Sequence, residues 1–334
     1  MKSNLIGKVL SVWIRRGELM GNRSMQLLVF GGLLMIFCTA AYPQELAYDS
    51  IFDKDVKFEG MYFSNQEPDT IPIPFGQGLI DPEIHHIHSA PAFSPSLDEM
   101  FFSVYLNYGD HQRIFYSQKV NGVWNRPALA AFSGDYSDGG PVFSPEGNTL
   151  FFYSKRPVNL GDSTNQTRIW YVVKSQNKWE DPKLMFINDS VGLSFYPDHL
   201  TSDGTLYFSV KAGKRDYDLY KGMLVNSQVQ NIQKLEAPFS LNNKIENGVT
   251  IDPENSILIF QALDRDGDGK LKLMMSRREN DSSWTAPRPL SPLINIEHTR
   301  FASFTPDGKY FIYTSYKSGV EEMYWLKSSF LIEK

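Results

Sequence analysis

Cysteine is almost absent from this chain of 334 residues, since Cys38 is the only one. If Cys38 is removed with a leader, no disulfide can stabilise the mature protein, and a Cys–His nucleophile is excluded. The sequence also lacks a G-x-S-x-G elbow, an H-E-x-x-H helix, a Walker loop and the Ser-x-Asp-x-Gly-x-x-Trp box of sialidases. The common signatures of hydrolases, zinc proteases and nucleotidases are therefore missing.

Positive charge is also scarce. The formal net charge is -5 and the pI is about 5.7, so the chain lacks the basic surplus of nucleic-acid-binding proteins, and we expect no nucleic-acid partner. Aromatic residues are abundant instead, with 23 Phe, 17 Tyr and 6 Trp. Aromatic side chains suit a half-buried pleated surface, so the composition favours β structure.

The first 41 residues have the layout of a secretory signal peptide. In MGNRSMQLLVFGGLLMIFCTAAYPQ, a basic Arg23 precedes an apolar run from Leu27 to Cys38 and a small-residue exit at Thr39–Ala41. The run is shorter than the roughly 20 apolar residues of a membrane span. We therefore predict an exported protein, periplasmic or associated with the cell envelope, whose mature chain has no transmembrane span.

Two details of this leader stay open. The residues upstream of it fit poorly, and Met20 or Met25 is the expected natural start. Cys38 could carry a lipid anchor, but a lipoprotein requires a small residue where this chain has the bulky Phe37. We therefore favour cleavage near Ala41 over lipidation.

One phrase recurs along the rest of the chain. GPVFSPEGNTLFFYS begins at Gly139, and related stretches begin at Ser89, Tyr196, Gly248 and Phe301. Equivalent positions recur about every 50 residues, which indicates the blades of a β-propeller. These equivalent positions are Phe93, Phe143, Leu200, Ile251 and Phe304.

Each repeat predicts four short strands. The first ends at the Ser-Pro-x-Gly turn, where Pro presets φ and Gly takes the left-handed position. An aromatic second strand and an amphipathic third strand follow, and a Trp-x-x-Pro element introduces the fourth. Four strands per unit make one blade, so we predict an all-β propeller with five blades. Six blades are the alternative, if residues 46–68 form more than a lead-in.

The last repeat ends without its fourth strand, and the missing strand is predicted at the other end of the chain. TIPIPFGQGLI (Thr70–Ile80) aligns without a gap on TAPRPLSPLIN (Thr285–Asn295). The N-terminal strand should therefore complete the last blade, because an unpaired blade edge invites aggregation. The expected organisation is a leader at 1–41, a lead-in at 42–69 and one propeller domain at 70–334.

The pattern in PVFSPEGNTLFF and ASFTPDGKYFIY resembles the WD-like propeller repeat of the TolB type. The resemblance spans about residues 70–334. It implies a propeller fold and an exported bacterial protein, and it leaves the activity open. Such repeats occur in periplasmic TolB proteins and in enzymes such as oligogalacturonate lyases. The lead-in is too short for the N-terminal module of TolB, so a role in the Tol system is not expected.

Segments that enter the innermost strand of each blade should ring one mouth of the central channel. Converging polar groups at a concave mouth define the candidate binding site. Its predicted residues are His86, His88, Asp138, Tyr196, Glu246, Asn247, His298 and Arg300. His and carboxylate side chains could hold Mn, Fe or Zn there. The bland interpretation is a solvated loop with one locally bonded histidine, and the metal ligands of the lyases do not map onto this chain.

A second candidate is LDRDGDGK, at residues 263–270. Asp264, Asp266 and Asp268 alternate as in a Ca²⁺ loop, but the closing Glu is replaced by Met275. A polar hairpin loop is the simpler interpretation. Basic residues after the second strands could face an anionic ligand such as a uronate, or could be plain surface. They are Lys155, Arg156, Lys211, Lys214 and Arg215.

Two functional hypotheses follow from these residues. The favoured one is a non-catalytic, monomeric propeller that binds a protein or a glycan at the cell envelope and needs no cofactor. The alternative is a carbohydrate-active enzyme, a metal-assisted lyase or a glycoside hydrolase, with its site at the channel mouth. The second hypothesis requires His86, His88, Glu246, His298 and Arg300 to converge within side-chain reach.

Overall fold

The computed structural model divides the chain into two compact units, Met1–Ser50 and Ile51–Lys334. It describes residues 28–30, 33–35, 51–53, 55–64, 66–78, 86–106, 111–159, 161–187, 192–213, 216–239, 244–264, 268–280, 283–317 and 320–332. In the first unit, β1 (Leu28–Phe30) pairs with β2 (Leu33–Met35). Cys38 and most of the predicted leader lie outside the described residues. Within the described part of the chain, no helix is long and apolar enough to cross a membrane.

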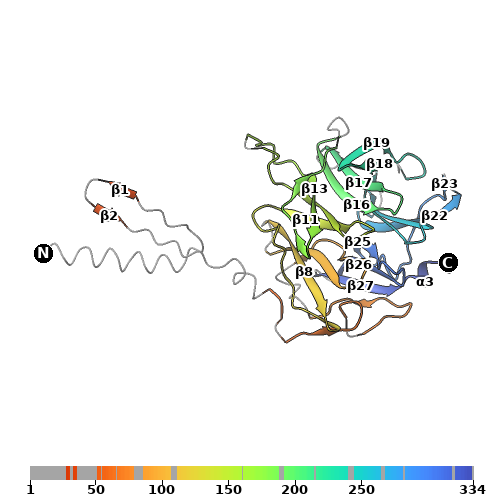
Figure 1. Cartoon of the computed structure of the whole chain (residues 1–334). Coiled ribbons are helices and arrows are strands. Elements are labelled where there is room, and N and C mark those ends of the chain that lie inside the picture. The colour runs from red at the N-terminus through yellow and green to blue at the C-terminus, as the bar shows by residue number, and fades with distance from the viewer. Residues whose placement is uncertain are drawn as a thin grey trace. The chain divides into compact units, whose positions relative to one another are not determined.

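The described residues of the second unit form five antiparallel sheets, which follow one another in chain order except that β4 joins the last sheet (Figure 1). The first sheet contains β3 (Phe58–Glu59), β5 (His86–Ile87), β6 (Ala92–Phe93), β7 (Glu99–Tyr105), β8 (Gln112–Val120), β9 (Val123–Trp124) and β10 (Ala128–Leu129). The second contains β11 (Asp138–Phe143), β12 (Thr149–Ser154), β13 (Arg168–Ser175), β14 (Lys178–Trp179) and β15 (Lys183–Leu184). These are the first two predicted blades.

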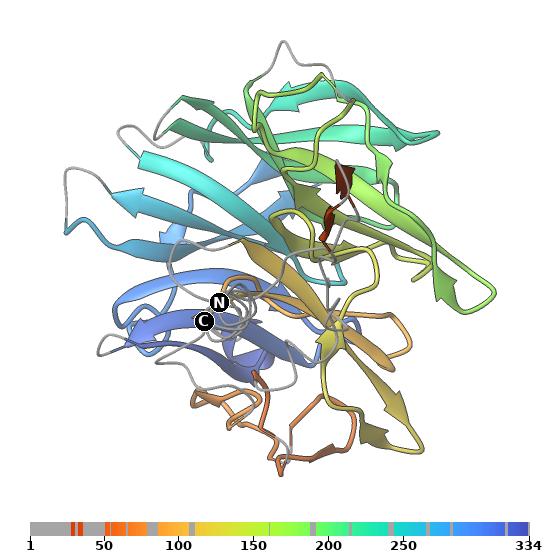
Figure 2. The same ribbon diagram turned by 90° about the vertical axis from the view of Figure 1, so that its left-hand side faces the viewer.

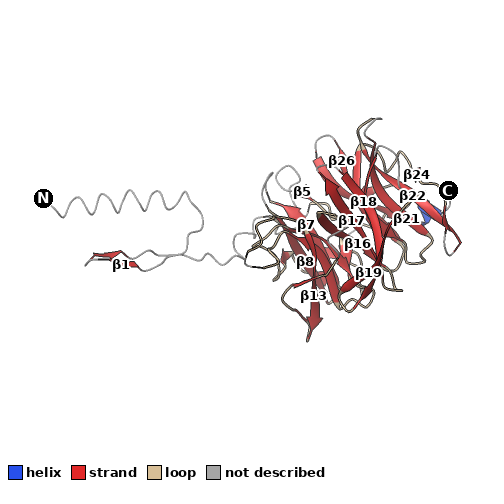
Figure 3. Cartoon of the chain, turned by 90° about the horizontal axis from the view of Figure 1, so that it is seen from above, coloured by secondary structure: helices blue, strands red, loops and turns tan. Residues whose placement is uncertain are grey.

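The remaining three sheets repeat the arrangement. The third contains β16 (Ser194–Leu200), β17 (Thr205–Gly213), β18 (Asp216–Val225) and β19 (Gln228–Lys234). The fourth contains β20 (Lys244–Ile251), β21 (Ile257–Asp264), β22 (Leu271–Asn280), β23 (Ser283–Trp284) and β24 (Arg288–Pro289). The fifth contains β25 (His298–Phe304), β26 (Tyr310–Lys317), β27 (Val320–Lys327) and β4 (Ile73–Pro74). The predicted all-β propeller is confirmed, and α3 (Ser329–Ile332) is the one helix among the described residues (Figure 3).

The recurring Ser-Pro-x-Gly phrase forms the turn between the first two strands of a blade. In these turns a side-chain oxygen of the first residue accepts a backbone N–H that follows the turn. The distances are 3.3 Å from Thr149 N to Ser144 Oγ and 3.0 Å from Tyr310 N to Thr305 Oγ1. Gly147 has a φ of +75°, and a Cβ there would lie 2.9 Å from the ring of Pro95 in the preceding blade. The Ser-Pro-x-Gly motif therefore recurs because it closes the turn and packs against the neighbouring blade.

Each innermost strand from the second blade onward also carries a bulge, where the pairing register shifts by one residue. Gly140, Gly248 and Phe301 take left-handed backbone at these bulges. Their N–H groups point to the preceding blade and bind side chains of its second strand. The acceptors are Ser103 Oγ at 3.3 Å, Ser209 Oγ at 3.0 Å and Gln261 Oε1 at 3.2 Å, respectively. The bulges therefore satisfy backbone donors that the ladder leaves free and bind adjacent blades together.

The hydrophobic core consists of clusters between neighbouring sheets. Phe101 and Ile114 of the first sheet pack with Phe152 and Trp170 of the second. Three further clusters join the second sheet to the third, the third to the fourth and the fourth to the fifth. No blade buries both of its faces alone, so the stability of each blade depends on its neighbours.

The predicted closing strand is confirmed in its register. In β4, Ile73 pairs with Trp325 and Pro74 with Tyr324 of β27. The aligned strand β24 of the fourth sheet pairs in the same way with β22. The next residue repeats the match, because Phe75 N donates to Met323 O and Leu290 N to Leu273 O, both at 2.9 Å.

The described residues of the lead-in, 51–53, 55–64 and 66–69, belong to the second unit and fill the seam between the last and the first blade. Figure 2 shows residues 51–78, in orange, beside both the yellow first blade and the blue last blade. Phe63 is fully buried and contacts the rings of Phe58, Phe75 and Trp124.

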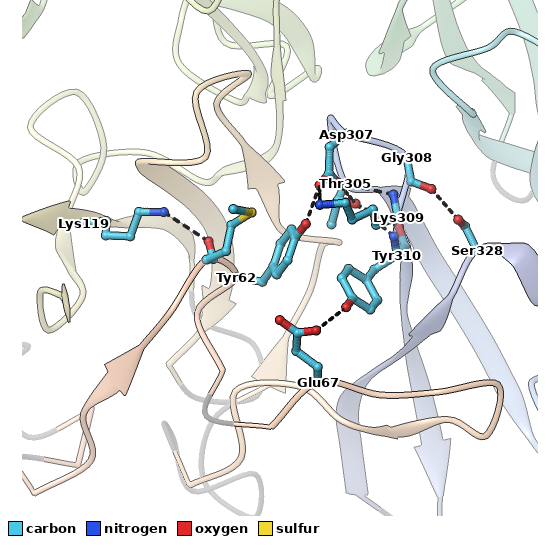
Figure 4. Close-up of polar contacts among 10 residues, drawn as sticks. Tyr62, Glu67, Lys119, Thr305, Asp307, Gly308, Lys309, Tyr310 and Ser328 are labelled. Carbon is cyan, nitrogen blue, oxygen red and sulfur yellow. Dashed lines mark hydrogen bonds and ion pairs between the residues drawn. The ribbon is translucent and has the colours of Figure 1, made fainter. Parts of the chain in front are cut away.

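Two tyrosines add polar contacts to this seam. Tyr62 donates to Asp307, and Tyr310 donates to Glu67 Oε2 at 2.7 Å (Figure 4). Both bonds join the lead-in to the fifth blade, so the segment is fastened by hydrogen bonds as well as by packing.

The seam can be tested with two substitutions in the same segment. Phe75 is 3% exposed, and its ring contacts Phe93 of the first blade and Trp325 of the last. Phe75→Ala should lower the free energy of unfolding by about 3–5 kcal/mol, because it leaves a cavity in the core. Ile71→Ala, at a side chain 69% exposed, should change it by less than about 0.5 kcal/mol. Urea titration of the full chain measures both, and equal losses would contradict the assigned role of Phe75.

Candidate functional site

A cavity of about 690 Å³ lies along the axis of the propeller. Residues of the innermost strand of every sheet line it, from β6, β11, β16, β20 and β25. At one end the lining includes the residues that begin these strands. At the other end it includes the turn prolines Pro95, Pro145, Pro253 and Pro306. The cavity is therefore the central channel that the repeats predicted.

Four tyrosines gather at the end where the innermost strands begin, and we call them the tyrosine mouth. They are Tyr105, Tyr153, Tyr196 and Tyr217. The ring centroids are 5.1 Å apart for Tyr153 and Tyr196 and 5.9 Å apart for Tyr196 and Tyr217. Tyr153, Tyr196 and Tyr217 line the channel directly. Such rings offer a ligand broad apolar faces with polar tips.

Burial keeps the hydroxyl groups of the tyrosine mouth protonated. It raises the pKa of Tyr196 to about 12 and that of Tyr153 well above its ordinary value. The Tyr153 hydroxyl donates to Gln112 Oε1, and Gln112 Nε2 donates to the backbone oxygen of His88 at 2.9 Å. The aromatic lining is thus positioned by hydrogen bonds that cross from one blade to the next.

His88 and Arg300 complete this end of the channel without adding a free positive charge. The ring of His88 packs between Tyr105 and Phe301, and burial, aided by Arg300, holds its pKa well below the ordinary value. His88 is therefore neutral at pH 7. Arg300 binds Glu321 through two bonds, at 2.7 Å from Nε to Oε1 and 2.6 Å to Oε2. This bidentate pair neutralises the guanidinium.

Half of the predicted mouth residues line the channel. Those that do are His88, Tyr196, Asn247 and Arg300. Those that are not among the lining residues are His86, Asp138, Glu246 and His298. Glu246 is buried, whereas His298 is exposed and its Nδ1 accepts the Leu271 N–H at 3.2 Å. The five residues that the enzyme hypothesis requires therefore do not all meet in the channel.

Asp138 was predicted at the channel mouth, but it has a structural role. Its carboxylate is fully buried, 2.9 Å from Arg156 Nη2 and 2.9 Å from Ser133 Oγ. Burial raises the pKa of Asp138, and the Arg156 guanidinium opposes that rise. Arg156 is itself buried against the rings of Phe152 and Trp170, so it does not face an anionic ligand as the sequence suggested. The pair belongs to the core of the second blade.

The aspartate loop shows only local interactions where it is described. Asp268 forms an ion pair with Lys272 at 2.7 Å and accepts the Lys270 N–H at 3.1 Å. Asp266 and the side chain of Asp264 lie outside the described residues, as do His85, Lys214 and Arg215. Across the described part of the chain, no three His, Cys, Asp or Glu side chains are close enough to hold a metal ion.

Asp198, which is not among the residues predicted from the sequence, lines the channel at the bulge of β16. Its carboxylate accepts a hydrogen bond from Ser209 Oγ at 2.6 Å. Burial raises its pKa to about 7, although bonds from Ser209 and from the backbone of Val249 and Gly248 lower it. A sequence signal exists: the third repeat reads Tyr-Pro-Asp-His-Leu, with a carboxylate where most repeats have an apolar or small residue.

Comparisons with known proteins agree with this architecture. No family model and no curated protein sequence matches the chain. TolB from Acinetobacter baumannii is similar at 16% identity and a TM-score of 0.48, with 72% of this chain and 52% of that chain covered. A protein from Agrobacterium tumefaciens described as a TolB is 14% identical at a TM-score of 0.49, with 74% and 78% covered. A thermostable family-43 glycoside hydrolase is 12% identical at a TM-score of 0.46, with 72% and 93% covered.

The class of protein is thus an all-β propeller, and TolB structures are among those similar to it, as the repeats predicted. The chain spans about half the length of the Acinetobacter TolB.

The assigned role of Arg156 leads to a stability test. Arg156→Met removes the partner of a fully buried carboxylate and should lower the free energy of unfolding by about 3–5 kcal/mol. Lys155→Met, at the exposed neighbouring position, should have little effect. Denaturant titrations of both variants at pH 7 give the comparison. If Arg156→Met is as stable as the wild type, the ion pair is not a structural requirement.

Asp198 leads to a pH-dependent prediction. Its folded-state pKa of about 7 exceeds the ordinary value of 3.8, so folding binds a proton between these pH values. Stability due to the protonated carboxyl is present near pH 4 and is lost as the pH rises to about 7. Asn cannot ionise, so Asp198→Asn should be more stable than the wild type at pH 8, with a smaller advantage at pH 4.5. Thermal unfolding at both pH values measures this difference.

The control is Asp181→Asn, an exposed aspartate on the outer part of the second blade. It should leave the melting temperature unchanged at both pH values. An advantage of Asp198→Asn that is the same at pH 4.5 and pH 8 would contradict the assigned burial of its carboxyl.

Proposed function

We propose that this protein is an exported, non-catalytic propeller that binds a glycan or a protein partner at the cell envelope through its tyrosine mouth. The observation that carries the proposal is the grouping of Tyr153, Tyr196 and Tyr217 along one end of the channel. Tyrosine rings provide large contact areas at a small entropic cost and are enriched in binding surfaces. The mouth is also preformed, because neighbouring blades hold its side chains in place.

Two sequence features support the location. The leader at residues 1–41 has the order of a secretory signal, with a basic start, an apolar run and a small-residue exit. The repeats resemble those of exported bacterial propellers. Together they support a site of action outside the cytoplasm, where envelope glycans and proteins are available as partners.

One observation favours the alternative of a carbohydrate-active enzyme. A carboxyl with a pKa near 7 in a channel is a suitable general acid, and Asp198 has this property. Glycoside hydrolysis usually requires a second carboxylate. The other two in the channel lining, Asp203 and Asp252, accept backbone N–H groups of their own turns, at 3.0 Å from Thr205 and 2.6 Å from Ile257. A binding role therefore accounts for more of the site.

Calorimetric titration with oligosaccharides, followed by mass analysis of the recovered sugar, tests the proposal. Soluble peptidoglycan fragments and hexasaccharides of glucose, xylose, mannose and galacturonate form the panel. Tyr217→Ala in the full chain should weaken binding of any ligand found by at least ten-fold, because it removes one face of the mouth. The recovered sugar should be intact.

Phe186→Ala is the matched control. Phe186 is an aromatic side chain, 60% exposed, on the outer part of the second blade. Its removal should leave binding unchanged. A ligand recovered in cleaved form would replace the binding role with the enzymatic one, and binding lost in Phe186→Ala but kept in Tyr217→Ala would move the site off the channel.

A further inference from the structure

Two hydrogen-bond acceptors from adjacent blades lie in the channel beside the tyrosine mouth. Asp198 comes from the bulge of β16 and Asn247 from the bulge region of β20. They are neighbours, because Ser209 Oγ donates to the Asp198 carboxylate at 2.6 Å and accepts the N–H of Gly248, which follows Asn247, at 3.0 Å. Asn247 Oδ1 is buried and receives no hydrogen bond from any described residue.

A buried acceptor of this kind is stabilised by a donor that the described residues do not supply. Leaving a buried polar atom without a partner costs about 1–3 kcal/mol. Asp198 accepts from Ser209 Oγ and from the backbone of Val249 and Gly248. A carboxylate has about four lone-pair sites, so about one of them remains to accept a further donor. No described ion pair neutralises Asp198, in contrast to Asp138.

The charged groups along the channel restrict the kind of ligand that can supply this hydrogen-bond donor. Among the described lining residues, Arg300 alone is permanently cationic, and Glu321 already pairs with it. Burial lowers the pKa of His88 well below its ordinary value and that of His199 to about 4, so both are neutral at pH 7. Carboxylates are the remaining charged groups of the lining, and Lys211, whose Nζ lies 5.6 Å from the ring centroid of Tyr217, is not among the lining residues. The charge of the lining therefore disfavours a polyanion.

We propose that Asp198 and Asn247 form an acceptor pair that binds the hydroxyl groups of a neutral saccharide, while the tyrosine mouth packs against its apolar ring faces. The inference rests on the proposed function, since it names the ligand class of the same channel. A sugar supplies hydroxyl donors and apolar C–H faces together, which matches acceptors beside aromatic rings. A hydroxyl bound to a carboxylate is a charge-assisted hydrogen bond, roughly twice as strong as a neutral one. The site therefore rejects uronates and selects uncharged sugars.

The test compares three hexasaccharide probes of different charge in calorimetric titrations of the full chain at pH 7.5. They are cellohexaose as the neutral probe, hexagalacturonate as the anionic probe and chitosan hexamer as the amine-bearing probe. Cellohexaose should bind, and the xylose and mannose hexamers extend the neutral set. Asp198→Asn and Asn247→Ala should each raise the dissociation constant of the neutral probe at least ten-fold. Asp181→Asn is the control and should leave it unchanged.

This design separates the effect of a substitution on folding from its effect on binding. Asp198→Asn should bind less tightly while it melts at a higher temperature than the wild type at pH 8, so a loss of binding cannot come from unfolding. Tighter binding of the anionic or the amine-bearing probe than of every neutral probe would overturn the inference. Neutral binding that depends on Tyr217 but not on Asp198 or Asn247 would also overturn it, and would leave the proposed function in place. If no saccharide binds, the inferred ligand class is wrong, and the proposed function is then the binding of a protein partner.

Discussion

The seam between the last and the first blade is the contact on which the rest of the structure depends. Each of the other blade interfaces joins consecutive segments of the chain, whereas this one joins residues more than 200 positions apart, as in the bond from Ser303 Oγ to Pro91 O. Strand β4 gives the last sheet its outer strand, and Phe63 and Phe75 fill the space behind it. The ring centroids of His88, in the first blade, and Phe301, in the last, are 4.6 Å apart, so the channel mouth is itself built across this seam. The candidate site therefore exists only in the closed ring.

The bulges connect this architecture to the chemistry of the channel. A regular innermost strand would direct its backbone N–H groups into the ladder of its own sheet. The bulge turns one of them toward the preceding blade, where Ser103, Ser209 and Gln261 accept it. The polar side chains near the axis thus divide into those that fasten blades and those that remain available. Asn247 belongs to the second group, because its Oδ1 has no partner among the described residues.

The sequence predicted the fold better than the site, for a physical reason. Strand order and the register of β4 follow from repeated turn chemistry, which is local and survives in each copy. The lining of the channel depends on which face a side chain takes, and one bulged residue reverses that face. Asp138 and Asn247 both precede a bulge by a residue or two, yet one is buried in an ion pair and the other lines the channel. Tyr153 and Tyr217 were not predicted because they lie on second and third strands. The repeat places these strands farther from the axis than the innermost strand, but their ends reach the mouth.

Asp138 and Asp198 differ in how the burial of their carboxyl groups is compensated. Both lie on innermost strands of adjacent blades, and burial raises the pKa of both. Arg156 compensates the burial of Asp138, so that aspartate needs no explanation beyond the stability of its blade. Asp198 has Ser209 and backbone donors but no cation, and an Asn would make the same neutral bonds without the penalty of burying a charge. Such a residue lowers the stability of the fold, whereas a similar uncharged side chain would not. Residues of this kind are expected at functional sites, since folding alone does not explain their presence. Its position in the channel lining beside Asn247 and the tyrosine mouth is the reason we propose a role for it in ligand binding.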